Sequence, residues 1–193
     1  YIAQLRSWLP REIGGILWFG NDDGNMVAYV PIYCSNTERA ECFNTPGADA
    51  VTFSDKNAFW VCNWVSNMVY PRYSQLFPAL KEVRDSLDNA FLAAQKGVEA
   101  KAESLYATDK AAAVKYLNDY SIQKSNEMIA RWRQLAIHLI VKFNDMAVKP
   151  EKDGKFLRTS TGLGEHVKRP GYSDYFKREL VKQTGDKFAV PNK

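Results

Sequence analysis

Two long stretches of the chain carry apolar residues at every third or fourth position, with charged residues between them. The first stretch is entered near Tyr73, and the second restarts at Thr108 or Asp109 and weakens at residues 118–121 before it resumes. This spacing is typical of amphipathic helices, so we predict an antiparallel helical hairpin. At ~1.5 Å per residue each arm is about 50 Å long, which indicates that the hairpin lies across a broad sheet.

Residues 16–34 carry the strongest strand signal. The runs ILWFG and MVAYVPIYC flank an Asn-Asp-Asp-Gly-Asn turn, a pattern that predicts a β-hairpin with its second arm at residues 26–34. Both faces of that arm are apolar, with no alternation of apolar and polar residues. We therefore expect other parts of the protein to pack on both faces. Pro31 cannot donate to a neighbouring strand, so we expect it at an edge or a bulge. Residues 1–12 are expected to form a loop that leads into the first strand.

A shorter helix is predicted before the hairpin. Ser54 or Asp55 is expected to cap it, and Trp60 and Trp64 fall on one of its faces. Near the end of the chain, Ser173 is expected to cap another short helix, which closes at a glycine.

We treat residues 1–193 as one region of a larger protein. Strands and loops are expected at residues 1–55, helices at 56–147 and a wrapping tail at 148–193. The chain opens on Tyr1 without a methionine or a leader-like segment, so we expect the true beginning of the polypeptide to lie upstream.

Composition and charge narrow the functional classes. The chain is 46% hydrophobic and 25% charged, which predicts a compact fold in water. Its net charge of +4 is spread along the sequence, which argues against a nucleic-acid partner. No apolar run reaches the roughly 18–20 residues that a membrane span needs. The sequence contains no Walker loop, GxGxxG, GxSxG or HExxH pattern, and no cofactor is expected.

The cysteines and histidines do not form a recognisable site. Cys34, Cys42 and Cys62 show no metal-ligand spacing, so no metal is expected, and a Cys34–Cys42 disulfide stays open at this point. His138 lies in an apolar helical turn and His166 in a loop, and neither has the setting of a general base.

The best candidates for a binding site are polar residues set among large apolar ones. Asn63, Asn67 and Arg72, with Ser66 and Tyr73 nearby, include amides and a guanidinium that would suit a peptide carboxylate or amide. The alternative is that Asn67 and Arg72 only satisfy backbone carbonyls at the junction before the long helix.

Several blocks of the sequence, in the same order, resemble the second half of a dipeptidase A-like cysteine dipeptidase. That family belongs to the N-terminal nucleophile hydrolases. The resemblance covers nearly the whole chain. The blocks are LRSWLPREIGGILWFGNDDGNMVAYVPIYC at residues 5–34, TERAECF at 37–43, SDKNAFWVCNWVSNMVYPRYSQLFPAL at 54–80, YLNDYSIQKSNEMIARWRQLAIHLIVKF at 116–143 and PGYSDYFKRELVKQTGDKF at 170–188.

The resemblance implies an α+β fold, part of a four-layer αββα sandwich. It also implies hydrolysis of dipeptides by a cysteine at the mature N-terminus, whose own α-amino group acts as the base. None of the three cysteines matches that position, so we expect no catalytic residue within this chain and no activity from it alone. The expected partners are a dipeptide substrate and the N-terminal portion of the same protein. Arg72 is carried over as a nucleophile-supporting residue, with Asn67 and Asn63 lining the same pocket.

Two other functions remain open. The Trp and Tyr groups would serve as a peptide- or glycan-binding surface if Trp60 and Trp64 were exposed. The helical hairpin would serve protein association if its apolar stripe were exposed. Uncovered sheet edges would favour homo-oligomers. Members of the family are often exported, so the resemblance favours a periplasmic or secreted location.

Overall fold

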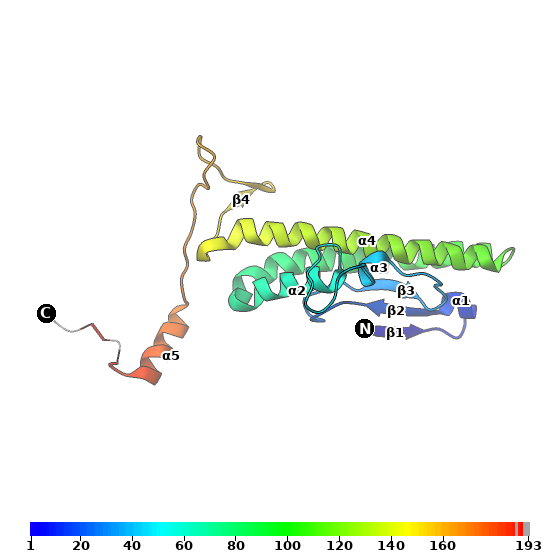
Figure 1. The fold of residues 1–193 in the computed structure, drawn as a ribbon, viewed down its shortest axis with the longest axis horizontal. Coiled ribbons are helices and arrows are strands. Elements are labelled where there is room, and N and C mark those ends of the chain that lie inside the picture. The colour runs from blue at the N-terminus through cyan, green and yellow to red at the C-terminus, as the bar shows by residue number, and fades with distance from the viewer. Residues whose placement is uncertain (188, 191–193) are drawn as a thin grey trace. The chain divides into compact units, whose positions relative to one another are not determined.

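The computed structural model describes residues 1–187, 189 and 190, and its chain divides into two compact units, Tyr1–Leu139 and Ile140–Lys193. Figure 1 labels the main elements. The first unit contains β1 (Ile2–Leu5), α1 (Arg11–Gly14), β2 (Gly15–Phe19), β3 (Val30–Tyr33), η1 (Glu41–Phe43), α2 (Ala58–Val69), η2 (Tyr70–Arg72), α3 (Tyr73–Tyr106) and most of α4 (Lys110–Phe143). The second contains η3 (Asn144–Met146), β4 (Glu151–Lys152), β5 (Lys155–Phe156) and α5 (Asp174–Thr184). The chain is therefore α+β, as predicted.

The first unit is built on a three-stranded antiparallel sheet in the order β1-β2-β3. The predicted β-hairpin is confirmed, but its second arm is only four residues long. The expectation of a loop at residues 1–12 is wrong for residues 2–5, which form β1 and pair with β2, and for residues 11 and 12, which begin α1. Four residues without polar alternation carry too little pattern for a strand to be recognised.

One face of the sheet lies against the helices. Ile16, Trp18 and Tyr33 point to this side and are at most 7% exposed. Helix α3 crosses the same side, where Gln95 donates to the side chain of Gln4 on β1 at 3.1 Å. The core of the first unit therefore lies between the sheet and the hairpin.

The other face of the sheet is apolar and is covered only at the end near the β2–β3 loop, where Val30 is fully buried and Phe19 packs edge-on against Phe43 of η1. Strand residues alternate between the two faces, so the side that we call the outer face carries Ala3, Leu5, Leu17, Phe19, Val30 and Ile32. Leu5 is 76% exposed, and the middle of this face is only half-buried. The described residues thus provide one helical layer and one sheet layer.

The two edges of the sheet differ. Cys34 N donates to Gly15 O, and hydrogen-bonded positions alternate along an antiparallel pair, so the backbone nitrogens of Tyr29, Pro31 and Tyr33 face away from β2. Pro31 is therefore at an edge, as predicted, with no N–H on the outward side. In Figure 1, β1 is the strand farthest from α4.

The helical hairpin is confirmed. Asp109 caps α4 by accepting from Ala112 N at 3.0 Å. The predicted weak point at residues 118–121 is not a break, because α4 runs without interruption through it. Its polar residues have partners instead: Asn118 Oδ1 accepts from Thr37 N and Glu38 N, at 3.1 and 2.9 Å.

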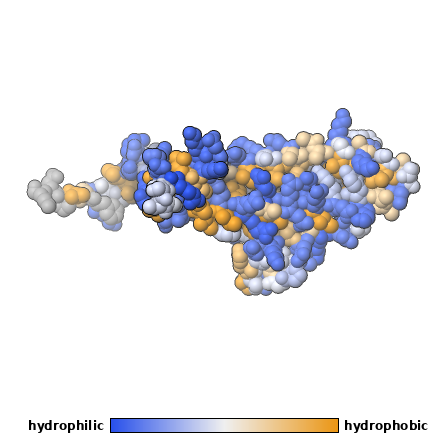
Figure 2. Space-filling model, turned by 90° about the horizontal axis from the view of Figure 1, so that it is seen from above, coloured by the Kyte–Doolittle hydropathy of each residue, from blue (hydrophilic) through white to orange (hydrophobic). Residues whose placement is uncertain are grey.

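The apolar stripe of α3 is buried, including Leu80, Leu87 and Phe91. Seen from the α4 side, hydrophilic residues cover much of the surface and hydrophobic patches interrupt them (Figure 2). Exposed apolar side chains on the hairpin include Leu92 and Ile137. The buried stripe weakens the interpretation of the hairpin as an association surface.

The shorter helices follow the predicted pattern with one correction. The side chain of Asn57, and not that of Ser54 or Asp55, caps α2 by accepting from Trp60 N. In the second unit, Ser173 caps α5 as predicted. No helix of the described residues is both long and apolar enough to span a bilayer. The prediction that residues 148–193 wrap around the rest stays a prediction.

Candidate functional site

The three candidate residues lie along α2 and at the start of α3, but they face different partners. Asn63 Nδ2 donates to Asp22 Oδ1 at 3.0 Å. Asn67 is exposed and its Nδ2 donates to the carbonyl of Asn63, one turn earlier. Arg72 Nε donates to Gln75 Oε1 at 3.0 Å, within the first turn of α3. Among these contacts, only that of Asn63 reaches another part of the chain.

That contact belongs to a group of hydrogen bonds that holds the β2–β3 loop. Tyr70 Oη donates to Asp23 Oδ2 at 2.7 Å, and Asn25 Nδ2 donates to Tyr73 Oη at 2.8 Å. Asp22 has a φ of 69°, a conformation that an aspartate tolerates better than most residues. We call Asp22, Asp23 and Asn25, with their partners Asn63, Tyr70 and Tyr73, the loop clamp.

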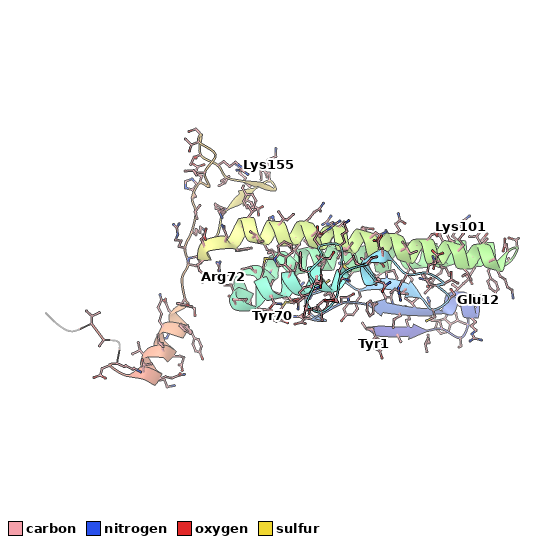
Figure 3. All side chains as sticks on the ribbon, in the orientation of Figure 1. Tyr1, Glu12, Tyr70, Arg72, Lys101 and Lys155 are labelled. Carbon is pink, nitrogen blue, oxygen red and sulfur yellow. The ribbon has the colours of Figure 1, made fainter. Side chains whose placement is uncertain are left out.

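The electrostatics of the loop clamp favour an ionised carboxylate. The hydrogen bond from Tyr70 and that from the Asn25 backbone N–H lower the pKa of Asp23. The same carboxylate raises the pKa of Tyr70, because it accepts the phenolic proton. Figure 3 labels Tyr70 and Arg72 close together near one end of the first unit. The sequence gave no sign that Asp22 is the partner of Asn63, and the binding role of Asn63 stays a prediction.

At the opposite end of the sheet, near Glu12 in Figure 3, lies a cavity of about 770 Å³. Its walls come from the end of β1 and the loop that follows, from α1 and the start of β2, and from the residues directly after β3. It includes the exposed thiol of Cys34. The lining residues are Leu5, Arg6, Ser7, Leu9, Arg11, Glu12, Gly14, Gly15, Cys34 and Ser35.

A buried ion pair supports one wall of this cavity. Arg6 Nη1 binds Glu99 Oε1 on α3, and the two side chains are 8% and 12% exposed. Arg6 Nη2 also donates to Ile13 O at 3.2 Å. Tyr33 Oη and Gln95 Nε2 both donate to the same Glu99 oxygen, at 3.3 and 3.1 Å.

Sequence reasoning missed this ion pair, whose partners are 93 positions apart. The only signal was Glu99 itself, which lies one position after Val98 in the buried stripe of α3. A carboxylate on that face requires a partner when it is buried.

The cysteines do not form a catalytic centre within the described residues. All three are free, so the Cys34–Cys42 disulfide is not formed. Burial raises the pKa of Cys42 to about 11 and raises that of Cys62 further, which keeps both thiols protonated. Cys34 is exposed, but the walls of its cavity include no histidine.

The structure bears on the metal prediction and on the binding-surface alternative. Among the residues that the structure describes, no cluster of three or more His, Cys, Asp or Glu side chains is placed to hold a metal ion.

Trp60 and Trp64 are half-buried, and both pack edge-on to Phe53. Trp60 Nε1 donates to Asp49 O at 2.8 Å. These aromatic residues are therefore partly used to fix the loop before α2.

The loop clamp and the cavity beside Cys34 contain polar groups, but neither contains a paired thiol and histidine among the described residues. Two comparisons with known proteins bear on this. Residues 1–86, which contain the sheet, α2 and the start of α3, match the model described as Peptidase family C69. A protein of Streptococcus pyogenes serotype M1 described as "Probable dipeptidase B" is 19% identical over 140 residues, which make up 72% of this chain and 28% of that protein.

The chain thus spans less than a third of the length of this relative. Peptidase family C69 has the N-terminal nucleophile fold, in agreement with the predicted α+β class. Both matches agree with the resemblance of the sequence to the dipeptidase A-like cysteine peptidases.

Proposed function

We propose that residues 1–193 are the scaffold half of a cysteine dipeptidase and form part of its substrate cleft. The reactive cysteine stands at the mature N-terminus of a longer polypeptide, outside this chain. The peptidase family match and the dipeptidase relative support hydrolysis of peptide bonds. The length of that relative supports the placement of further polypeptide beside residues 1–193.

The uncovered part of the outer face, which lies toward β1, is the observation that carries this proposal. Ala3, Leu5, Leu17 and Ile32 form an apolar surface opposite the helices, and Leu5 alone is 76% exposed. Apolar sheet faces are normally packed against another layer. A second layer from the same polypeptide would bury this face and bring the reactive cysteine to the sheet.

The cysteines of this chain fit a supporting role. Cys42 and Cys62 are buried with raised pKa values, and Cys34 has no histidine among its cavity neighbours. An attacking thiol requires a nearby base or a lowered pKa. We therefore assign none of the three as the nucleophile.

The experiment compares residues 1–193 with the full-length polypeptide on a panel of unblocked dipeptides. We expect hydrolysis by the full-length protein, its loss after treatment with iodoacetamide, and none by residues 1–193. A full-length Cys34→Ser variant serves as the control and keeps its activity. Hydrolysis by residues 1–193 that disappears in Cys34→Ser would contradict the proposal, because the nucleophile would then lie within this chain.

The proposed roles of Arg72, Asn67 and Asn63 need a separate test. Arg72→Ala in the full-length protein is expected to reduce kcat/KM, and Arg72→Lys should recover part of the loss. Lys101→Ala is the matched control, since Lys101 is an exposed cation on the same helix and Figure 3 shows it far from Arg72. Unchanged turnover in Arg72→Ala would remove Arg72 from the site.

A further inference from the structure

The β3 edge of the sheet is closed by side chains from the helical hairpin. Tyr29 N donates to Asp88 Oδ1 on α3 at 2.9 Å, and Tyr33 N donates to Ser121 Oγ on α4 at 3.4 Å. Between them, Pro31 has no N–H to offer. Every backbone donor on this edge, from residue 29 to residue 33, is therefore bonded or absent.

The β1 edge is open. Arg6 N donates to Gly14 O, and hydrogen-bonded positions alternate, so Gln4 faces β2 while the backbone groups of Ala3 and Leu5 point away from it. No described residue of the chain bonds to these two outward N–H groups. A strand edge with free donors and acceptors is a template for another strand.

A groove runs beside the open edge on the helix-facing side. Its volume is about 410 Å³, and its walls are mainly apolar. A strand that paired with β1 would place alternate side chains over this groove and the remaining ones over the outer face. The groove is lined by Ile2, Ala3, Gln4, Trp18, Tyr29, Asp88 and Leu92.

We propose that β1 pairs with a fourth strand, which the same polypeptide contributes from outside residues 1–193. This strand is apolar on both faces, because the groove and the outer face are both apolar. The inference rests on the premise of the proposed function, that further polypeptide packs on this sheet. It adds the edge at which that polypeptide joins and excludes the β3 edge.

Amide hydrogen exchange at single-residue resolution tests the proposal. In the full-length protein, the N–H groups of Ala3 and Leu5 should exchange on the order of 100-fold more slowly than in residues 1–193 alone. The N–H of Gln4, which is bonded to β2 in both, is the internal control. Equal, fast exchange of Ala3 and Leu5 in both proteins would overturn the proposal.

A proline variant gives a second measurement. Ala3→Pro removes an outward N–H without removing a bond to β2, so residues 1–193 alone should keep their unfolding midpoint. The full-length variant should lose the slow exchange at Leu5, whereas the matched Ala3→Ser variant should retain it. Retention of slow exchange in full-length Ala3→Pro would contradict strand pairing at this edge.

Two further readouts distinguish pairing within one polypeptide from self-association, and edge pairing from peptidase activity. Exchange that slows with protein concentration, together with a dimer in analytical ultracentrifugation, would assign the edge to a second copy and overturn the proposal. Dipeptide hydrolysis is measured on the same samples. Protection without hydrolysis would support edge pairing and contradict the proposed function, and hydrolysis without protection would do the reverse.

Discussion

Both faces of the three-stranded sheet are mainly apolar in sequence, but they differ in burial, most clearly at Ile16 and Leu5. On the helix-facing side, Ile16 is fully buried. On the outer side, Leu5 is 76% exposed although it lies on the neighbouring strand. Hydrophobic residues on a strand therefore indicate which surfaces require cover, and the helical hairpin covers only one of the two.

The difference also concerns polar groups. The helix-facing side contains a buried ion pair and several hydrogen bonds to it, whereas the outer side contains apolar side chains. Buried polar groups need partners to offset their desolvation. The buried ion pair has such partners in Tyr33 and Gln95, so changes to it should be costly within residues 1–193.

The largest effect is expected at the buried ion pair. Glu99→Ala leaves the Arg6 guanidinium without its carboxylate, which should lower the free energy of unfolding by about 3–5 kcal/mol. Urea denaturation of residues 1–193 measures it. Glu103→Ala, an exposed glutamate one turn later, should change the free energy by less than about 0.5 kcal/mol. Equal effects of the two variants would show that the ion pair does not stabilise this face.

A pair of alanine variants compares the two faces directly. Ile16→Ala should destabilise residues 1–193 by about 2–5 kcal/mol, because it opens a cavity in the core. Leu5→Ala should cost less than about 0.5 kcal/mol in the same protein. In the full-length protein the Leu5→Ala cost should rise. A Leu5→Ala cost that stays the same in both proteins would indicate that nothing packs on the outer face.

A smaller effect is expected where the hairpin holds the segment after β3. Asn118→Ala leaves the backbone N–H groups of Thr37 and Glu38 without their acceptor, which should cost about 1–3 kcal/mol. Thermal or urea unfolding measures it, with the exposed Asn126→Ala on the same helix as the control. A neutral Asn118→Ala would show that water replaces the lost acceptor.

The smallest effect is expected at the loop clamp. Hydrogen bonds from Tyr70 and Asn25 lower the pKa of Asp23, so their contribution to stability is present above the unfolded-state pKa of about 3.9 and is lost as pH falls through the folded-state pKa. Tyr70→Phe should raise the pKa of Asp23 and reduce the loss of unfolding free energy that occurs as the pH falls. Carbon-13 NMR titration of the Asp23 carboxyl measures it, and the Asp49 carboxyl, held by its own loop, is the internal control.

Local pattern was sufficient for the helices, because α3 and α4 repeat their apolar positions over 34 residues each. It was insufficient for β1, whose four residues have no alternation. The polar interruption at residues 118–121 indicated a weak helix, yet Asn118 serves a segment some 80 positions earlier. Contacts of that separation depend on the fold and are not visible in local spacing.

The candidate site shows the same limit. Asn63 and Arg72 were singled out as polar groups among apolar neighbours, and in the structure they donate to Asp22 and Gln75, while their binding role stays a prediction. The sequence contained no indication that Arg6 and Glu99 meet, because each is ordinary in its own helix or loop. The roles of Arg72, Asn67 and Asn63 in the full-length peptidase depend on polypeptide beyond these residues and stay proposals.

The proline within β3 has a consequence for how the molecule is made. A newly synthesised chain whose sheet has two open edges can pair with strands of other unfolded chains at either edge. Pro31, Asp88 and Ser121 close the β3 edge and leave only the β1 edge open. Further strands can therefore join the sheet only at β1, and mispairing with other chains at β3 is prevented.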